Sequence, residues 1–294
     1  MVDLGLLQCP TCRGALRERS GELHCPACAV SYPLLQNAVP VFVPATKQHA
    51  VPSHKRQRSS LRRVAKNLAA PHHSLYFGSF TPSYEEGKEL QTFLQSQGDV
   101  SVLNIGSLSK NIKHMHPGII NLDIAHYASV DVVGDAHALP FRDGCVDVIL
   151  FKNVLEHIRD PDKVMEEIWR VLKPGGTLYI KIPFLQPFHA VPDDFQRYTV
   201  SGIRQMLKEY EELNFDISVG PGSMLSWMLR EWLAVLFSRG NMTLYQGGLL
   251  VFGWLTFWIK YTDFLFLRNP LANRVTSAFV GFYRKPAPMV SRKD

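Results

Sequence analysis

Short apolar runs alternate with turn-forming and amphipathic segments along the middle of the chain. The runs are rich in valine, isoleucine and leucine, which is typical of strands that are buried on both faces of a parallel sheet. Such strands, separated by helical or turn segments, predict an α/β fold. The predicted strands cover residues 101–105, 119–124, 130–133, 146–151 and 177–182.

One predicted helix has clear start and stop signals. Asp160 is a candidate N-cap, and Pro161 occupies the first turn, where its missing N–H has no cost. The Lys-Pro-Gly-Gly segment at 173–176 ends the helix. Its apolar side chains share one face and are predicted to be core residues: Val164, Ile168, Val171 and Leu172.

Two carboxylates follow consecutive predicted strands. Asp123 comes at the end of the second strand, and Asp135 comes just after the third. In an open α/β sheet, the ligand crevice lies at these carboxyl ends. A carboxylate after the second strand can accept both hydroxyls of a ribose, and one after the third can accept an exocyclic amine. The pattern therefore predicts a nucleoside-binding site.

The same region resembles the class I S-adenosylmethionine (SAM) methyltransferases, in particular the ubiquinone-biosynthesis and type 11 group. The similar segments are 102–106, 134–136, 139–141, 153–157 and 171–176, within a resemblance that covers roughly residues 100–182. It implies a Rossmann-like sheet, SAM as cofactor and methyl transfer as the reaction. The cofactor-binding residues that it implies are Asn104, Gly106, Ser107, Asp123, Ile124, Asp135, Ala136 and Asn153.

The first turn departs from the family pattern Asp-x-Gly-x-Gly-x-Gly. This chain has Asn104, Gly106, Leu108 and Lys110 at the four defining positions. Small residues there let backbone N–H groups approach the cofactor. We expect a rebuilt loop that still holds SAM with the help of the two carboxylates. The alternative is a methyltransferase-like domain that serves only for binding.

Four of the five cysteines form two Cys-x-x-Cys pairs, Cys9 with Cys12 and Cys25 with Cys28. Two such pairs supply the tetrahedral set of thiolates that zinc prefers. The spacer between them suits a hairpin that turns at Ser20-Gly21. Because protein fills all four ligand positions, we predict structural zinc. A redox pair and a ribbon that has lost its metal are the alternatives.

With Tyr32-Pro33 and residues 39–42, the cysteine region is similar to the Trm112-like zinc ribbons, which commonly serve as partner or leader modules for methyltransferases. The predicted organisation is therefore a zinc ribbon over 1–45, a basic linker over 46–75, a methyltransferase domain over 76–222 and 271–294, and an apolar helical insertion over 223–270.

The charge of the chain favours acidic partners. The net charge is +6, and residues 45–71 contain several lysines and arginines but no carboxylate, with a short basic helix predicted over 61–68. This linker is interpreted as contacting phosphates of RNA or lipid head groups, or as a solvated connector. The N-terminus lacks the pattern of a secretory signal, which predicts a cytoplasmic protein, with peripheral contact to the inner face of the membrane.

The insertion is unusually apolar and aromatic. Its uncharged run from Met242 to Ile259 approaches the ~20 residues that cross a bilayer. Gln246-Gly247-Gly248 is expected to break that run. Helices at a bilayer interface or around a lipophilic substrate are predicted; a cap over the sheet, a homodimer interface and a membrane span are the alternatives. Strands over 215–219 and 277–283 are predicted to flank the insertion as a hairpin.

The segment after the last parallel strand contains the candidate catalytic residues His189, Asp194 and Tyr198. Histidine can accept a proton near neutral pH, and Asp194 is expected to orient it. An ion pair between Asp194 and Arg197 is the competing structural interpretation. His157 is expected to have a packing role at least as readily as a catalytic one.

These features together predict a SAM-dependent methyltransferase that acts on a small, glycan or lipid-linked acceptor near the membrane surface. Methylation of rRNA or tRNA is an alternative that fits the zinc ribbon and the basic linker, but the apolar insertion makes nucleic acid the weaker partner. A catalytically inactive binding module is the third.

Overall fold

The computed structural model describes residues 2–35, 38–44, 86–108, 112–189, 193–266 and 268–288. The predicted basic helix over 61–68, the rest of the linker and Lys110 therefore lie outside the described residues.

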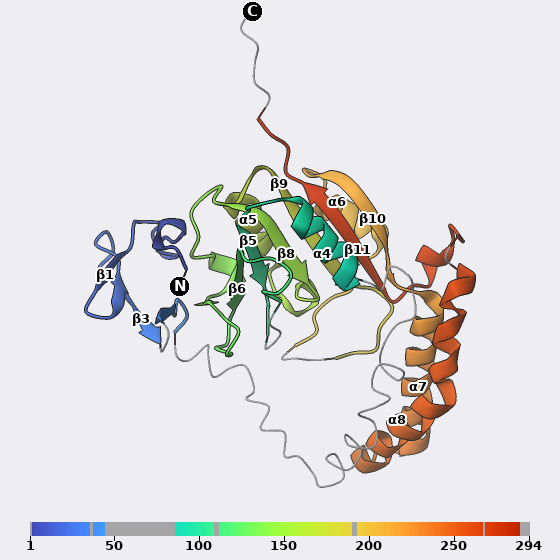
Figure 1. Ribbon diagram of the computed structural model, residues 1–294. Coiled ribbons are helices and arrows are strands. Elements are labelled where there is room, and N and C mark those ends of the chain that lie inside the picture. The colour runs from blue at the N-terminus through green and yellow to red at the C-terminus, as the bar shows by residue number, and fades with distance from the viewer. Residues whose placement is uncertain are drawn as a thin grey trace, which may run out of the picture.

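A seven-stranded sheet forms the centre of the molecule (Figure 1). Its strand order is β10-β11-β9-β8-β5-β6-β7, and only the pairings of β11 with β9 and with β10 are antiparallel. The strands are β5 (Val102–Ile105), β6 (Ile119–Asp123), β7 (Val132–Val133), β8 (Val146–Lys152), β9 (Leu172–Pro183), β10 (Glu211–Val219) and β11 (Ala278–Arg284). All predicted strands are therefore confirmed, including the hairpin that flanks the insertion.

Helices cover both faces of this sheet. Helix α4 (Glu86–Ser96) packs Leu90 and Leu94 onto one face, and α5 (Pro161–Val171) and α6 (Val200–Met206) pack onto the other. The predicted start of α5 is confirmed, because the Asp160 carboxylate accepts a hydrogen bond from Lys163 N. Leu172 was expected on the helix but is the buried first residue of β9.

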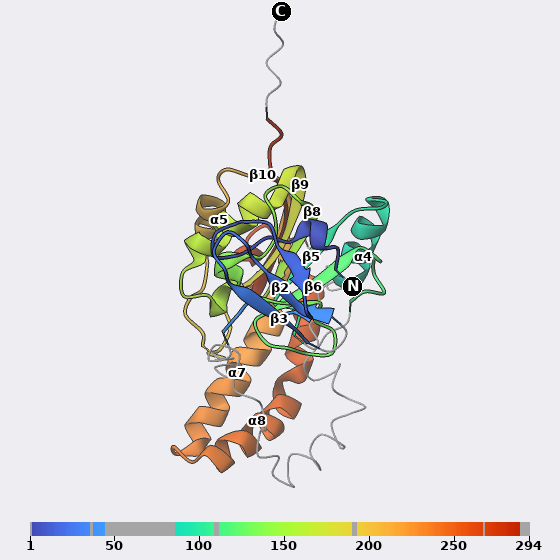
Figure 2. The same ribbon diagram turned by 90° about the vertical axis from the view of Figure 1, so that its left-hand side faces the viewer.

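The N-terminal module extends the sheet beyond its last strand. It contains the short strands β1 (Arg17–Arg19), β2 (Glu22–His24), β3 (Ser31–Leu35) and β4 (Val39–Pro40). The turn at Ser20-Gly21 is confirmed, with both residues at positive φ. Val41 pairs with Val133 of β7 in parallel, and Leu7 pairs with Phe141, so the module covers the β7 edge (Figures 1 and 2).

The insertion is a helical hairpin that projects from the far side of the sheet (Figure 1). It consists of α7 (Pro221–Ser238), α8 (Met242–Thr256) and the 3-10 segment η7 (Phe257–Phe266), followed by the short turn η8 (Ala272–Arg274). The expected break at Gln246-Gly247-Gly248 is wrong, because α8 runs through it. A Cβ on Gly248 would lie 3.2 Å from Ala234 Cα, so this glycine lets the two helices pack closely.

Candidate functional site

The carboxyl edge of the sheet carries the turns that would face a ligand. After β5 the chain turns at Gly106, which has a φ of +73°. A Cβ there would lie 2.3 Å from Val154 Cγ2, in the turn that follows β8. Gly106 is therefore required both by its backbone conformation and by the close approach of two turns.

Asp123 ties the first turn to the end of β6. Its Oδ2 accepts a hydrogen bond from Leu108 N at 2.8 Å, and its Oδ1 accepts one from Ala125 N at 3.0 Å. The side chain is buried, and burial raises the pKa of this carboxyl. Leu108 itself has a φ of +50°, so a non-glycine residue adopts the conformation that this turn requires. Asp123 thus compensates for the missing glycine by fixing the loop.

Asp135 follows β7 and begins the 3-10 turn η5 (Ala136–Ala138). Its Oδ1 accepts hydrogen bonds from His137 N and lies 2.6 Å from His137 Nδ1. Ser107 Oγ, in the first turn, is buried without a hydrogen-bond partner in the described chain. Two carboxylates and an unpartnered hydroxyl at one sheet edge fit the polar groups of an adenosine, so these residues suit SAM.

Four other predicted cofactor residues have different surroundings. Asn104 is buried within β5, and its Nδ2 donates to Asn121 Oδ1 at 2.9 Å, so it joins two strands. Ile124 packs partly against the valine cluster of the N-terminal module, and Ala136 lies in the core. Asn153 is exposed after β8 at a φ of +50°, where it remains available to a ligand.

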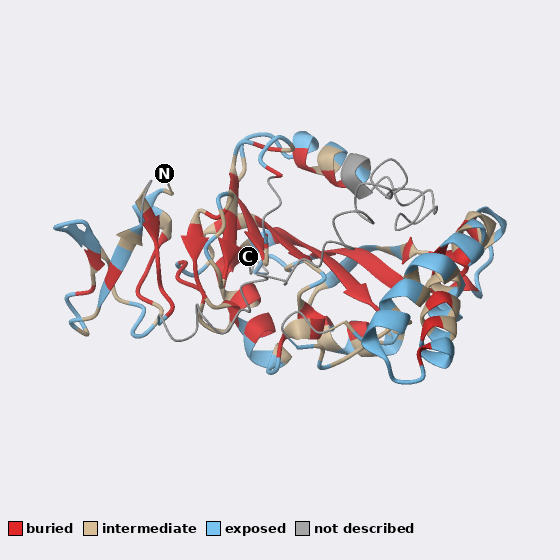
Figure 3. Cartoon of the chain, turned by 90° about the horizontal axis from the view of Figure 1, so that it is seen from below, coloured by how far each residue is buried: buried red, intermediate tan, exposed pale blue. Residues whose placement is uncertain are grey.

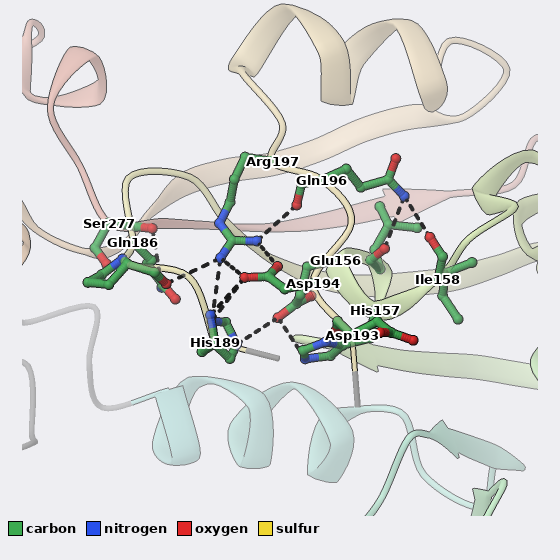
Figure 4. Close-up of polar contacts among 12 residues, drawn as sticks. Glu156, His157, Ile158, Gln186, His189, Asp193, Asp194, Gln196, Arg197 and Ser277 are labelled. Atoms are coloured by element: carbon green, nitrogen blue, oxygen red, sulfur yellow. Dashed lines mark hydrogen bonds and ion pairs between the residues drawn. The ribbon is translucent and has the colours of Figure 1, made fainter. Parts of the chain in front are cut away.

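A second group of polar side chains lies beyond β8 and β9 (Figure 4). Glu156 and His157 belong to the turn η6 (Leu155–His157), and His189 comes from the segment after β9. Glu156 Oε1 lies 3.7 Å from His157 Nε2 and 3.9 Å from His189 Nε2. The two imidazole rings meet edge to face, with centroids 5.3 Å apart.

Several hydrogen bonds join residues 193–197 to η6 and to the residue that follows it (Figure 4). Phe195 N donates to Glu156 O at 2.8 Å, and Gln196 Nε2 donates to Leu155 O and Ile158 O. His157 Nδ1 lies 2.5 Å from Asp193 O, a contact in which the ring nitrogen is the donor. The two segments therefore hold each other in place.

Asp194 does not orient the His189 ring as predicted. Its Oδ2 is 3.7 Å from His189 Nδ1, which is too long for a hydrogen bond. The carboxylate instead forms a two-pronged ion pair with Arg197 and accepts the His189 backbone N–H at 2.9 Å. The alternative interpretation, an ion pair between Asp194 and Arg197, is present, and the Asp194 side chain is buried.

The predicted catalytic Tyr198 lies apart from this group. Its hydroxyl is buried and has no hydrogen-bond partner in the described chain. Burial, together with the charge of Asp162 on α5, raises the pKa of Tyr198 to about 12. The side chain packs against the core, so its place indicates a structural role.

Burial and neighbouring charges shift the pKa values of Glu156, His189 and Asp194. Burial raises the pKa of Glu156 and lowers the pKa of His189. Burial also acts to raise the pKa of Asp194, but hydrogen bonds from Arg197 outweigh it and hold that pKa below its usual value. At neutral pH, His189 is therefore an uncharged imidazole that can accept a proton.

The four paired cysteines converge in the N-terminal module. Cys9 Sγ is 3.6 Å from Cys28 Sγ, and Cys12 Sγ is 3.4 Å from Cys25 Sγ. Tetrahedral zinc with Zn–S bonds of about 2.3 Å needs sulfur separations of roughly 3.8 Å. All four sulfurs lie within 4.8 Å of one another, so the donor set fits a zinc ion.

Residues 106–180 match a protein-family model described as a methyltransferase domain. Together with the strand order, this match identifies the type of domain that contains the seven-stranded sheet. This part of the chain is a class I methyltransferase domain. The resemblance predicted from the sequence is confirmed.

Curated relatives match limited parts of the chain. The chain is 34% identical over 105 residues to the ubiquinone/menaquinone biosynthesis C-methyltransferase UbiE of Vibrio parahaemolyticus, covering 34% of this chain and 38% of that protein. It is 49% identical over 47 residues to the UbiE protein of Acidiphilium cryptum, covering 16% and 19%. The chain therefore spans less than two fifths of the length of these relatives.

Solved structures of methyltransferases are similar to this chain only at low identity and low TM-score. Phosphoethanolamine N-methyltransferase 2 of Haemonchus contortus, in complex with S-adenosyl-L-methionine, has a TM-score of 0.44 and 17% identity, covering 84% of this chain and 62% of that one. A complex of the Haloferax volcanii Trm112 methyltransferase activator with a methyltransferase has a TM-score of 0.44 and 14% identity, covering 79% and 97%. Both scores are below 0.5, so these likenesses say nothing about function.

Sequence reasoning did not single out Glu156 as a candidate site residue. Glu156 lies inside the Asn153–His157 motif that carried the resemblance, and a glutamate beside a histidine there is a usable signal. Its burial, however, depends on the segment 193–197 folding over it.

Proposed function

We propose that this chain is a SAM-dependent methyltransferase that acts on a small, glycan or lipid-linked acceptor at the cytoplasmic face of a membrane. The observation that carries the enzymatic part is the pair Asp123 and Asp135. Asp123 is hydrogen-bonded to the Gly106 turn through Leu108 N, and Asp135 follows β7 at the same carboxyl edge of the sheet; residues 106–180 match the methyltransferase family.

In this proposal, Asp123 and Asp135 hold the ribose hydroxyls and the adenine amine, with Asn153 and the backbone of the Gly106 turn beside them. When bound, SAM supplies an electrophilic methyl group on its sulfonium. The residues of this chain position an acceptor and exclude water, which is what transfer to an aligned nucleophile needs. His189, kept neutral by burial, takes up the proton that the acceptor releases.

In this proposal, the zinc ion of the cysteine site has a structural role. Cys9, Cys12, Cys25 and Cys28 fill four ligand positions and leave none for water. The module that they hold covers the β7 edge, through Val41 and Phe42 on Val133. We infer that zinc stabilises this cover, because so short a segment has little core of its own.

The helical hairpin supports a membrane location, because it is polar inside and apolar outside. Between the helices, Ser226 Oγ donates to Thr256 O at 2.8 Å, and Tyr245 donates to Glu231 at 2.6 Å. Small and polar residues at a helix contact are typical of helices in lipid. The exposed side chains are large and apolar: Trp232, Val235, Leu236, Phe237, Leu250, Val251, Trp254, Leu255 and Trp258. Figure 3 shows how much of the hairpin is exposed.

Length and composition agree with contact to a bilayer. In the described chain, the continuous helical segment Met242–Phe266 is long and apolar enough to cross a membrane, and 22% of its most apolar stretch is buried. The cationic Arg239 ends α7, and the net charge of +6 suits an anionic lipid surface. We propose that the hairpin lies in one leaflet of the bilayer rather than crossing it.

The base of the hairpin adjoins the proposed acceptor site. Val219, just before α7, accepts a hydrogen bond from Ser277 N, and Ser277 O accepts bonds from Phe184 N and Gln186 Nε2. The segment that carries His189 thus starts beside the hairpin. A lipid-linked acceptor held in the membrane surface would reach the sheet edge at this point.

Calorimetric titration of the full chain with SAM tests the enzymatic proposal. Gly106→Ala, which puts a Cβ into Val154 at a positive φ, should weaken SAM binding at least tenfold. Gly175→Ala is the matched control, because its φ is +80° but nothing lies within 4 Å of the added Cβ. No heat of binding for the unaltered chain, or unchanged affinity in the variant Asp123→Asn combined with Asp135→Asn, would refute the proposal.

A further inference from the structure

Glu156 is a buried carboxylate without the partners that burial normally requires. The residue is 1% exposed, and neither carboxylate oxygen accepts a hydrogen bond in the described part of the chain. A buried carboxylate without hydrogen bonds is costly, so such groups are usually paired or coordinate metals. Glu156 Oε1 instead lies within 4 Å of the Nε2 atoms of both His157 and His189 (Figure 4).

The two histidines present nitrogens that suit metal coordination. His157 uses Nδ1 to donate to Asp193 O, which leaves Nε2 with its lone pair directed toward Glu156. Fixing the tautomer by a hydrogen bond from the other ring nitrogen to a carbonyl is what metal-binding histidines usually show. His189 also turns Nε2 toward Glu156. Its Nδ1 accepts a hydrogen bond from Arg197 Nη2 at 3.4 Å, so metal binding at Nε2 requires the ring proton to move to Nδ1, 3.7 Å from Asp194 Oδ2.

We propose that Glu156, His157 and His189 bind a divalent transition-metal cation such as zinc or cobalt. The three ligand atoms lie within 4.8 Å of one another. Tetrahedral coordination with bonds of about 2.1 Å needs separations of roughly 3.4 Å. The distances of 3.7 and 3.9 Å from Glu156 to the imidazoles therefore have to shorten by only a few tenths of an ångström.

This site differs from the cysteine site in chemistry and openness. Two imidazoles and one carboxylate are the ligand set of open catalytic centres, whereas four thiolates close a structural one. The open positions of the metal would take an oxygen of the acceptor, a hydroxyl in particular. His189 would then be a metal ligand and not the proton acceptor proposed above, so the proton of the acceptor would pass to water. That use rests on the proposed methyltransferase function, but binding of the metal does not.

Metal content tests the proposal. The full chain is purified with one zinc in the cysteine site and then titrated with Co²⁺. We expect a second equivalent of metal, with the weak visible bands of nitrogen and oxygen ligation and without the near-ultraviolet charge-transfer band of thiolate ligation. Glu156→Gln and His189→Gln should each weaken this second equivalent by roughly 100-fold or more.

The controls separate loss of the site from loss of the fold. His137→Gln changes a histidine at the same sheet edge, outside the proposed ligand set, and should retain the second equivalent. Retention of the zinc in the cysteine site, and an unchanged far-ultraviolet circular dichroism spectrum, show that a variant is folded. A single metal per chain at saturating Co²⁺, or equal Co²⁺ affinity in both folded variants, would overturn the proposal whether or not SAM binds.

Discussion

Apolar side chains are covered at one edge of the central sheet and exposed beyond the other. At β7, the N-terminal module covers the edge, and Val41, in contact with Val133, is only 3% exposed. Beyond β10, the α7/α8 hairpin leaves its apolar side chains uncovered, and Val251 is 58% exposed. The first edge is completed by this chain itself, whereas the second surface needs a partner from outside, which we propose to be lipid.

The two regions also differ in where their charged side chains lie. The N-terminal module places two cysteines in its core and its charged side chains on the surface. The hairpin buries Arg230, Lys260 and Asp263 between its helices while it exposes tryptophans. Asp263 accepts hydrogen bonds from Gly222 N and Ser223 Oγ, so its burial fixes the start of α7. An inverted helix pair of this kind is suited to a solvent that is itself apolar.

The largest expected effect comes from removing the metal that we infer in the N-terminal module. The double variant Cys9→Ser and Cys25→Ser should bind no structural zinc and lose on the order of 10 kcal/mol of metal-linked folding energy in that module. Hydrogen exchange should then show residues 2–35 unprotected and β7 newly labelled, while β5 and β8 stay protected. Cys145→Ser, outside the cysteine site, is the matched control. Protection of residues 2–35 that survives loss of zinc would show that the module folds without metal.

Val41→Glu should have the next largest effect on stability, because it places an unpaired charge in the buried contact with β7. We expect a loss of about 3 kcal/mol or more of unfolding free energy, which lowers the melting temperature by roughly 10 °C. Thermal unfolding followed by circular dichroism measures this. A melting temperature within about 2 °C of the unaltered protein would mean that the edge is not covered in solution.

Val251→Glu makes the same substitution in the α7/α8 hairpin. There we expect almost no loss of stability but a large loss of vesicle binding. Because this valine is exposed, the unfolding free energy should change by less than about 0.5 kcal/mol. Co-sedimentation with anionic lipid vesicles should fall at least tenfold, since an apolar contact with lipid is replaced by a charge. Leu213→Glu, at an exposed leucine of β10, is the control and should bind vesicles normally. Equal vesicle binding by all three proteins would contradict the membrane proposal.

The smallest effect concerns the polar side chains beyond β8 and β9, which lie between these two regions in the sequence. The Asp194 carboxylate is 2% exposed and paired with Arg197, and its pKa is lower in the folded state than in the unfolded chain. Its stabilisation is therefore present above the unfolded pKa near 3.9 and is lost as the pH falls through the folded pKa. Asp194→Asn should cost about 1–2 kcal/mol at pH 7.

The pH dependence is the check on that assignment. The difference in melting temperature between Asp194→Asn and the unaltered protein should narrow as the pH falls below about 4. Arg197→Gln leaves the Asp194 carboxylate buried without its cation, so the difference in melting temperature between this variant and the unaltered protein should narrow at least as much over this range. A difference that stays constant from pH 7 to pH 3 would show that the ion pair does not stabilise the fold.

Periodicity and turn signals were enough to predict the sheet. Strands buried on both faces leave continuous apolar runs, and α5 was marked by Asp160 and Pro161 at its start. The paired cysteines were equally informative, because two-residue spacing brings two thiolates together whatever surrounds them. Local sequence carries these features, so they needed no tertiary information.

The candidate site was predicted less well, because its geometry depends on segments that meet only in the folded chain. Asn104 occupied a cofactor position in the motif, yet it pairs with Asn121 on the neighbouring strand. Tyr198 is near His189 in sequence but is turned toward α5. Side-chain direction at a sheet edge is set by packing across strands, which no single segment specifies.

The sequence by itself determined the α/β sheet, the two carboxylates at its edge and the cysteine set, because each follows from local spacing. Tertiary structure alone decided that Val41 would be covered and Val251 exposed, since both are valines in apolar runs. It also decided that Glu156 would be enclosed with two histidines, because residues 193–197 close over it from a distant part of the chain. Burial is a property of contacts between segments, and contacts form only when the whole chain has folded.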